Sequence, residues 1–356
     1  MPRNKLRSLR KKEHLILATQ GSRCSFVNYF ADIILPHDCL TAINPSEVDL
    51  STSLCGYVVA NPLYINALTG GALIAEAINR RLAILAAKFN LPLAVGSQTA
   101  GINSRSLRFT YQVVRKYNRE GLVMANISAS ATPRQAKEAV EMISAQILQL
   151  HLNPAQELIM PEGSSLTPGL LANIADICAV ASVPVIAKEV GFGLGAVQAR
   201  LLAKAGVRAV DVSGTGGTNF AVIEGRRNRS SWWKPFANWG LPTPLCLADV
   251  AAKVPEIEVL ASGGVNNGLR ALKCLALGAD AVGTAGDILA NLYHCGLAGA
   301  EHYLSSFLQQ MRVGAALMGV KSVKELKSVP LLISGKLKDL LEQKGINPAL
   351  YSERGE

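Results

Sequence analysis

Eight short apolar segments, separated by stretches of helical periodicity, constrain the fold of this chain more than any other feature. Continuous apolar runs of this length are typical of parallel strands that are covered on both faces. The segments are residues 64–68, 93–97, 122–127, 147–151, 183–188, 209–213, 258–262 and 281–284. Their regular recurrence indicates repeated strand and helix units in one sheet.

Helical patterns occupy residues 74–89, 134–144, 196–205 and 269–277. Thr132 and Pro133 supply an N-cap and a first helical residue. Gly206 and Gly278 follow the third and fourth patterns as C-terminal stop signals. The alternation predicts an α/β fold, a (β/α)8 TIM barrel, with a doubly wound open sheet as the alternative.

The segments outside the repeat divide the chain into three expected parts. Residues 1–62 form an N-terminal basic arm and cap, residues 63–320 the barrel, and residues 321–356 a C-terminal helical tail. No apolar run reaches 18 residues and the basic N-terminus lacks an apolar core, so we expect neither a membrane span nor a secretory signal. Seven dispersed cysteines without a Cys-x-x-Cys pair indicate a reducing compartment, the cytoplasm.

Much of the net charge of +10 lies in the first twelve residues. The cations there are Arg3, Lys5, Arg7, Arg10, Lys11 and Lys12. Such a run is either a solvated tail or the binding site of an anion. Aromatic residues are not interleaved with the charges, which disfavours nucleic acid and favours a phosphorylated small molecule.

Polar residues follow the fourth apolar segment, at the point where a barrel strand presents catalytic groups. His151 and Asn153 are two residues apart and are expected to point the same way at the strand end. Pro154 stops the strand, and Gln156 and Glu157 then lie on the loop above it. Because such a set is unfavourable to bury without a ligand, the sequence predicts an active site here.

Three glycine-rich runs, residues 211–219, 262–265 and 283–286, follow the last three segments and predict a phosphate site. Lys188 ends the fifth segment. Its ammonium needs either a carboxylate, Glu189 or Glu162, or an electron-rich ring or phosphate of a ligand. Small and amide residues near positions 66–71, 97 and 126 suit the edge of a planar cofactor.

Eight motifs occur in order: Arg10-Lys11-Lys12-Glu13-His14, Ala67-Leu68-Thr69-Gly70-Gly71, Gly96-Ser97-Gln98, residues 151–157, residues 188–193, residues 211–219, Ser262-Gly263-Gly264 and Thr284-Ala285-Gly286. Together they resemble type 2 isopentenyl diphosphate isomerase over about residues 10–320. The resemblance implies an FMN-binding TIM barrel that reversibly isomerises isopentenyl to dimethylallyl diphosphate, a small-molecule substrate, for isoprenoid biosynthesis. It further implies reduced FMN as the active acid and base, NADPH as reductant, Mg²⁺ on the diphosphate, and a homo-oligomer of four or eight chains.

The resemblance also assigns roles to residues. The substrate would be bound by Arg10, Lys11, Ser97, His151, Asn153 and Gln156. His151 and Gln156 would also be catalytic, and Glu157 would hold Mg²⁺. FMN would be held by Ala67, Leu68, Thr69, Ser97, Asn126, Lys188, Ser213, Thr218, Gly263, Gly264, Ala285 and Gly286. Our hypothesis is that the flavin moves the proton while Gln156 positions the alkene.

The sequence departs from the family after residue 163, where Ser164-Ser165-Leu166-Thr167 replaces an acidic and basic run, and the segment with Trp232, Trp233 and Trp239 is not placed. A 2-hydroxy acid oxidase would need a histidine base after the seventh strand, where residues 262–266 have none. A purine-nucleotide dehydrogenase would need a cysteine in residues 213–219, where none stands. A nucleic-acid binder explains residues 3–12 alone, and an inactive flavin-binding paralogue leaves residues 151–157 without a purpose.

Overall fold

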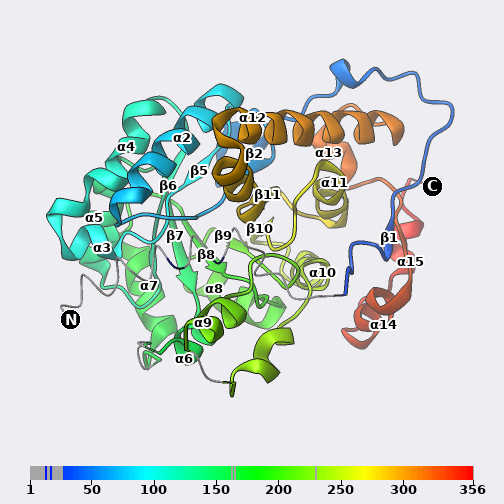
Figure 1. Ribbon diagram of the computed structural model, residues 1–356. Helices are drawn as coiled ribbons and strands as arrows, with labels where there is room; N and C mark the ends of the chain where they lie inside the picture. The colour runs from blue at the N-terminus through cyan, green and yellow to red at the C-terminus, as the bar shows by residue number, and fades with distance from the viewer. Residues whose placement is uncertain are drawn as a thin grey trace.

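The computed structural model describes Glu13, Leu17 and residues 27–161, 163, 166–228 and 231–355. A closed barrel of parallel strands lies at its centre, in the order β10-β11-β4-β5-β6-β7-β8-β9, with helices around it (Figure 1). The strands are β4 (Leu63–Ile65), β5 (Leu93–Ala94), β6 (Val123–Ser128), β7 (Ile147–Leu152), β8 (Val185–Glu189), β9 (Ala209–Asp211), β10 (Glu258–Ala261) and β11 (Ala281–Thr284). All eight predicted strands are present, so the TIM barrel is confirmed and the open sheet is wrong.

One main helix follows each barrel strand. In chain order these are α2 (Leu73–Phe89), α4 (Phe109–Tyr117), α5 (Pro133–Ile143), α7 (Leu170–Val180), α8 (Ala196–Lys204), α10 (Thr243–Lys253), α11 (Gly268–Leu277) and α12 (Gly286–Leu317). The predicted cap of α5 is confirmed, because Thr132 Oγ1 accepts from the Gln135 N–H at 3.3 Å and Gln135 Oε1 accepts from the Thr132 N–H at 3.0 Å. The helix α12 bends at Gly296, where φ is 67°.

The barrel interior changes from apolar to polar along its axis. At the amino ends of the strands one buried cluster contains Tyr64, Met124, Ile147, Ile186, Ala209 and Leu260. Two residues further along the same strands and the turns that follow them stand Asn66, Asn126, Gln149, Lys188, Asp211 and Ser262. Because side chains in a strand alternate with a period of two, these polar residues also face inward. The carboxyl end of the barrel is therefore the end equipped to bind a polar ligand.

A hairpin closes the other end of the barrel. The strands β2 (Thr52–Leu54) and β3 (Tyr57–Val59) pair in antiparallel fashion. Leu54 and Cys55 are buried in the apolar cluster, and the Cys55 N–H donates to Glu258 Oε2 at 2.6 Å. The hairpin therefore covers the amino ends of the strands and leaves a ligand to enter from the carboxyl ends.

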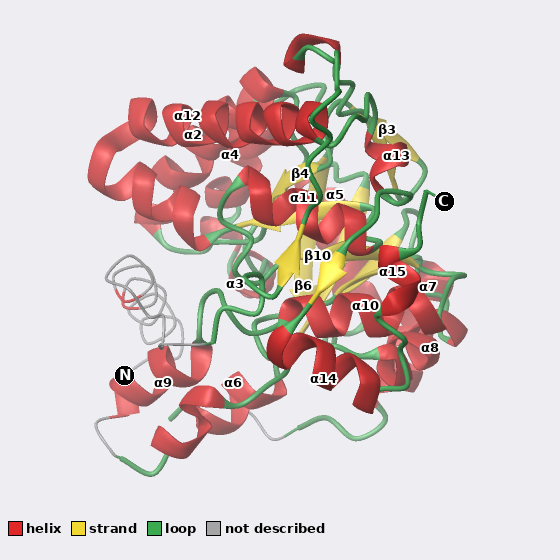
Figure 2. Cartoon of the chain, turned by 90° about the vertical axis from the view of Figure 1, so that its right-hand side faces the viewer, coloured by secondary structure: helices red, strands yellow, loops and turns green. Residues whose placement is uncertain are grey.

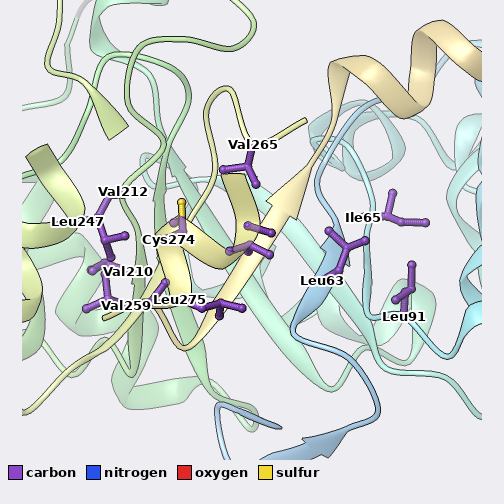
Figure 3. Packing of buried hydrophobic residues seen from close by; sticks show 14 of the residues in the cluster. Leu63, Ile65, Leu91, Val210, Val212, Leu247, Val259, Val265, Cys274 and Leu275 are labelled. Atoms are coloured by element: carbon purple, nitrogen blue, oxygen red, sulfur yellow. The ribbon is translucent and has the colours of Figure 1, made fainter. Parts of the chain in front are cut away.

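The main apolar core lies between the barrel and its helices. Figure 3 shows Val210 and Val259 of neighbouring strands beside Cys274 and Leu275 of α11. Leu275 and Val210 are fully buried, as is typical of strands covered by helices. This packing fixes the strand ends, and with them the loops of the site.

The segment before the barrel contacts the C-terminal tail. The strand β1 (Ile33–Ile34) pairs in antiparallel fashion with β12 (Leu332–Ile333), so the segment before the barrel lies beside the C-terminal tail (Figure 1). The tail contains α13 (Val323–Leu326), which confirms the helix expected near residue 321, followed by α14 (Gly335–Gln343) and α15 (Ala349–Ser352). Among the helices that the structure describes, none is long and apolar enough to cross a bilayer.

Candidate active site

The extra helices between barrel strands and their main helices include α6 (Pro154–Ile159) after β7 and α9 (Phe220–Asn228) after β9. The helices α6 and α9 lie side by side in Figures 1 and 2. The prediction of a loop after Pro154 is wrong, because Pro154 begins the helix α6. Proline is compatible with the first helical position, since the N–H that it lacks would have no helical partner there. Asn153 is the N-cap of α6, with φ −135°, and lies beyond the end of β7, so the prediction that Asn153 and His151 point the same way from one strand is not met.

The helix α6 gathers three of the predicted site residues. Asn153 Nδ2 lies 3.1 Å from both Gln156 Oε1 and Glu157 Oε1. The Gln156 amide in turn donates to Glu224 Oε1 of α9 at 2.8 Å. The orientation of the Gln156 amide is therefore fixed, with its oxygen toward Asn153 and its nitrogen toward Glu224.

Glu224 was not recognised in the sequence, because it lies in a helix that no strand-end pattern predicts. Its side chain is fully buried and forms an ion pair of 2.5 Å with Arg227. Arg227 also pairs with Glu13 at 2.8 Å. This contact joins α9 to Glu13 of the N-terminal arm, the segment whose sequence carries the predicted diphosphate ligands. Those ligands, Arg10 and Lys11, lie outside the described residues.

His151 lies two residues beyond Gln149 on β7, so its side chain faces the barrel interior. Its Nδ1 lies 2.9 Å from Asn126 Oδ1 on the neighbouring strand β6. The Asn126 amide donates to Gln149 Oε1 at 3.1 Å. The structure thus brings the predicted residues His151 and Asn126 together in one polar row across β6 and β7.

Lys188 is buried at the end of β8, with 7% of its surface exposed. Its partner is Asp211, since Lys188 Nζ lies 3.2 Å from Asp211 Oδ2. Of the two carboxylates suggested for Lys188 by the sequence, Glu189 is not its ion-pair partner, and Glu162 lies outside the described residues. Glu189 Oε2 instead accepts backbone N–H groups from residues 190–193 at 2.6–3.2 Å and shapes that loop. Burial raises the pKa of Glu189, and these hydrogen bonds act against that rise.

Asp211 is a second residue whose role the sequence did not reveal. It is fully buried and accepts from Tyr64 Oη at 2.8 Å, Asn66 Nδ2 at 2.9 Å and Ser262 Oγ at 2.8 Å. Burial raises the pKa of Tyr64, and the charge of Asp211 raises it further. The Tyr64 hydroxyl therefore keeps its proton and donates it in the hydrogen bond to the Asp211 carboxylate, which can only accept.

The glycine-rich loops after β9 and β10 pack backbone against backbone. A Cβ atom on Gly263 would lie 2.2 Å from the Gly214 oxygen, and one on Gly264 would lie 2.7 Å from the Gly216 oxygen. Glycine is required at both positions, which also have φ of +91° and +80°. The loops after β9 and β10 therefore form one closely packed unit.

The N-terminus of α12 lies beside the same unit. A Cβ atom on Gly286 would lie 3.2 Å from Thr218 Oγ1. The predicted residues Thr218, Gly263 and Gly286 are therefore neighbours. A long helix N-terminus beside glycine-rich loops after the last barrel strands is a favourable phosphate site. The set fits the phosphate of FMN.

The loops after β4 and β5 adjoin each other. The Gly96 N–H donates to the Thr69 oxygen at 3.0 Å, and Tyr111 Oη donates to the Ser97 oxygen at 2.6 Å. These bonds bring the predicted residues 67–69 beside Ser97. Together with Lys188, they provide amide, hydroxyl and ammonium groups that suit the polar edge of a flavin ring.

A cavity of about 640 Å³ lies at the opposite end of the barrel. Arg208, Glu258 and Asp280 are among its lining residues. Arg208 and Glu258 pair with each other at 2.8 Å. This cavity contains none of the predicted site residues and is separate from the carboxyl end of the strands.

Comparisons with known proteins show the family and the fold of the chain. A family model described as FMN-dependent dehydrogenase matches residues 100–332. The chain is 44% identical to an isopentenyl-diphosphate delta-isomerase of Symbiobacterium thermophilum over 99% of both chains, and 40% identical to that of Bacillus pumilus over 98% of both. A solved mandelate oxidase is 15% identical with a TM-score of 0.64, covering 91% of each chain, which shows a shared fold alone.

Proposed function

This chain belongs to the FMN-dependent, type 2 isopentenyl-diphosphate delta-isomerase family and is an isomerase, and from that premise we propose how its site works. The proposed reaction is the reversible 1,3-allylic isomerisation of isopentenyl diphosphate to dimethylallyl diphosphate. The observation that carries the proposal is the fixed set of Asn153, Gln156 and Glu157 on α6, held over the barrel by Glu224.

The proposed FMN site extends over five neighbouring loops. Its phosphate would be bound by the loops after β9 and β10 and by the N-terminus of α12. Lys188 and Asn126 would face the ring from the barrel interior, and residues 67–69 with Ser97 would bind its edge. When bound and reduced, the flavin supplies the group that donates and accepts the proton.

The proposed substrate site lies between the barrel and α6. Gln156 would position the alkene, because both ends of its amide are held by neighbours. Ile159, Phe192 and Ala221 form a buried apolar cluster beside it, which would exclude water from the five-carbon chain. His151 and Asn153 would reach the diphosphate, with Arg10 and Lys11 closing from the arm.

A magnesium ion is proposed at Glu157. Its carboxylate stands at the first turn of α6, with one oxygen 3.1 Å from the Asn153 amide. Carboxylate oxygens are the ligands that Mg²⁺ prefers, and the ion keeps further positions for water and substrate phosphate. The diphosphate carries enough charge to need both this ion and the basic arm.

The remaining parts of the proposal rest on the family resemblance. NADPH would reduce the flavin, the enzyme would act in the cytoplasm, and the chain would form a homo-oligomer of four or eight copies. A small diphosphate would be its ligand, with neither nucleic acid nor membrane as partner.

The fold likeness to mandelate oxidase does not carry a second function. Oxidation of a 2-hydroxy acid needs a base after the seventh barrel strand. There the structure has Ser262, whose hydroxyl donates to buried Asp211, followed by two glycines packed on the neighbouring loop. None of these side chains can remove a proton from a substrate.

The test is an anaerobic incubation with isopentenyl diphosphate, FMN, Mg²⁺ and NADPH. We expect dimethylallyl diphosphate when the flavin is reduced and none when it is oxidised or when Mg²⁺ is chelated. The variants Gln156→Asn and Gln156→Glu should lose turnover while binding FMN normally. A yellow protein without isomerisation, or a fully active Gln156→Ala variant, would overturn the proposal.

A further inference from the structure

We propose that Asp211 is a positioning residue that keeps the buried Lys188 charged and thereby sets the reduction potential of the bound flavin. This inference rests on the proposed function in one respect, the placement of Lys188 beside the flavin ring. It goes beyond that proposal by naming a residue behind Lys188 that does not itself contact the cofactor.

The hydrogen bonds around Asp211 show that it is a carboxylate. Its two oxygens receive the hydroxyls of Tyr64 and Ser262, the amide of Asn66 and the N–H of Ser213. All four partners donate to Asp211. The Lys188 ammonium is a fifth partner, with Nζ 3.2 Å from Asp211 Oδ2. A carboxylate that receives this many hydrogen bonds is stabilised in its charged form even without exposure to water.

The strand positions make this arrangement rigid. Tyr64 lies on β4, and Asn66 lies in the turn that follows β4. The strands β10 and β11 separate β4 from β9 in the barrel, so these two side chains reach Asp211 from across the interior. Lys188 and Asp211 are register partners on β8 and β9. The carboxylate is therefore held from both sides of the barrel interior, and its direction toward Lys188 is fixed.

The other contacts of Lys188 are neutral. Nζ donates to the Glu189 backbone oxygen at 2.9 Å and lies 3.4 Å from Ser213 Oγ. Among the residues that the structure describes, Asp211 is the carboxylate within ion-pair distance of Nζ. Without Asp211, this ammonium would be buried among uncharged dipoles alone, which strongly disfavours its charged form.

Three other titratable groups surround the pair, and none replaces Asp211. His151 is the register partner of Lys188 on β7, but its Nδ1 lies 2.9 Å from Asn126 Oδ1. The Glu189 carboxylate receives the backbone N–H groups of residues 190–193. Tyr64 faces Asp211 from across the barrel, and burial with the Asp211 charge raises its pKa.

Replacing Asp211 by asparagine therefore makes the charge of Lys188 depend on pH. At low pH, Lys188 of the variant keeps its positive charge but has lost the negative charge of Asp211. The extra positive charge stabilises the anionic reduced flavin, so the flavin potential of the variant is higher than that of the wild type. At high pH, Lys188 of the variant loses its proton, and the difference in potential disappears. The wild-type pair keeps both charges throughout.

The test measures the midpoint potential of bound FMN from pH 6 to pH 9 in the wild type and in Asp211→Asn. We expect the midpoint potential of Asp211→Asn to exceed that of the wild type at pH 6, and this excess to shrink as pH rises to 9. The decrease should be at least tenfold in the reduction equilibrium constant, or about 30 mV for a two-electron couple. Tyr64→Phe and Ser262→Ala remove neutral partners of Asp211 and are the matched controls. Their potentials should run parallel to the wild type, because the charge pair remains. Parallel profiles for Asp211→Asn would overturn the inference.

Two further variants separate this inference from the proposed function. If Lys188→Met leaves the potential unchanged, the placement of Lys188 beside the flavin is wrong. If Lys188→Met lowers the potential while Asp211→Asn runs parallel to the wild type, the flavin site stands and the role of Asp211 is wrong.

A double variant keeps the inference testable where Asp211→Asn does not fold. Removing both charges, in Lys188→Met with Asp211→Asn, should restore folding and FMN uptake, because no unpaired ammonium remains buried. Equal failure of the single and double variants would show that Asp211 acts through packing and would contradict the charge-based role.

Discussion

The close packing of Gly263 gives the sharpest test of the cofactor site. Gly263→Ala adds one methyl group at φ +91°, 2.2 Å from the Gly214 oxygen and 2.7 Å from Thr243 Oγ1. Gly56→Ala adds the same group at φ +88°, where no atom lies within 4 Å. The two changes therefore share the backbone strain and differ in the steric contact.

The expected magnitudes follow from this pair. The left-handed conformation costs an alanine about 1–2 kcal/mol, which both variants should lose from the free energy of unfolding. Gly263→Ala must also separate two packed backbones, which adds about 1–3 kcal/mol as in other overpacked sites. These loops belong to the proposed phosphate site, so displacing them should also weaken FMN binding. The affinity for FMN should fall about tenfold for each 1.4 kcal/mol of binding free energy that is lost.

Thermal unfolding and flavin fluorescence titration measure the two effects separately. Gly56→Ala should bind FMN as the wild type does and unfold at a slightly lower temperature. Gly263→Ala should unfold at a lower temperature than Gly56→Ala and bind FMN at least tenfold more weakly. Equal FMN affinity in both variants would refute the assignment of this loop to the phosphate.

Three further changes probe the catalytic and stabilising contacts. Glu224→Gln removes the carboxylate charge that holds the Gln156 amide. Initial rates should show turnover at least tenfold lower, while flavin titration should show unchanged FMN affinity. Unchanged turnover would contradict the positioning role of Glu224. Glu157→Gln should raise the Mg²⁺ concentration for half-maximal activity by tenfold or more, and an unaltered Mg²⁺ titration would exclude Glu157 as a ligand. Burial raises the pKa of Asp249, but the hydrogen bonds that it receives, including those from Lys253 and Lys344, outweigh this and lower it. The stabilisation is therefore present above the ordinary carboxyl pKa of about 4 and is lost as pH falls through the lowered pKa of folded Asp249. Asp249→Asn should cost about 1.5–3 kcal/mol at pH 7 and progressively less as pH falls below about 4, checked by unfolding across pH.

The barrel could be predicted because each strand carries its own local signal. Residues 147–152 are apolar enough to be identified as a strand without any tertiary information, and Thr132-Pro133 marks the start of α5. The predicted first strand extends three residues too far at its C-terminal end, since β4 ends at Ile65 rather than at residue 68. Ala67 and Leu68 are apolar, but they belong to the loop that adjoins Ser97.

The site was predicted less completely, because its contacts join distant segments. Glu224 lies 68 residues from Gln156, and nothing in the local pattern of α9 indicates that contact. Asp211 was noted as the start of a glycine-rich run, while its bonds come from residues up to 147 positions away. The inserted helix α6 was taken for a loop because Pro154 was interpreted as a strand terminator and not as a first helical residue.

The ratio of product formed to NADPH consumed tests the central claim most directly. The account predicts many dimethylallyl diphosphate molecules for each NADPH oxidised under anaerobic conditions, and the same turnover when dithionite replaces NADPH, because the reduced flavin is regenerated in each cycle. One NADPH consumed for each substrate molecule converted would contradict it and would show a net redox reaction instead.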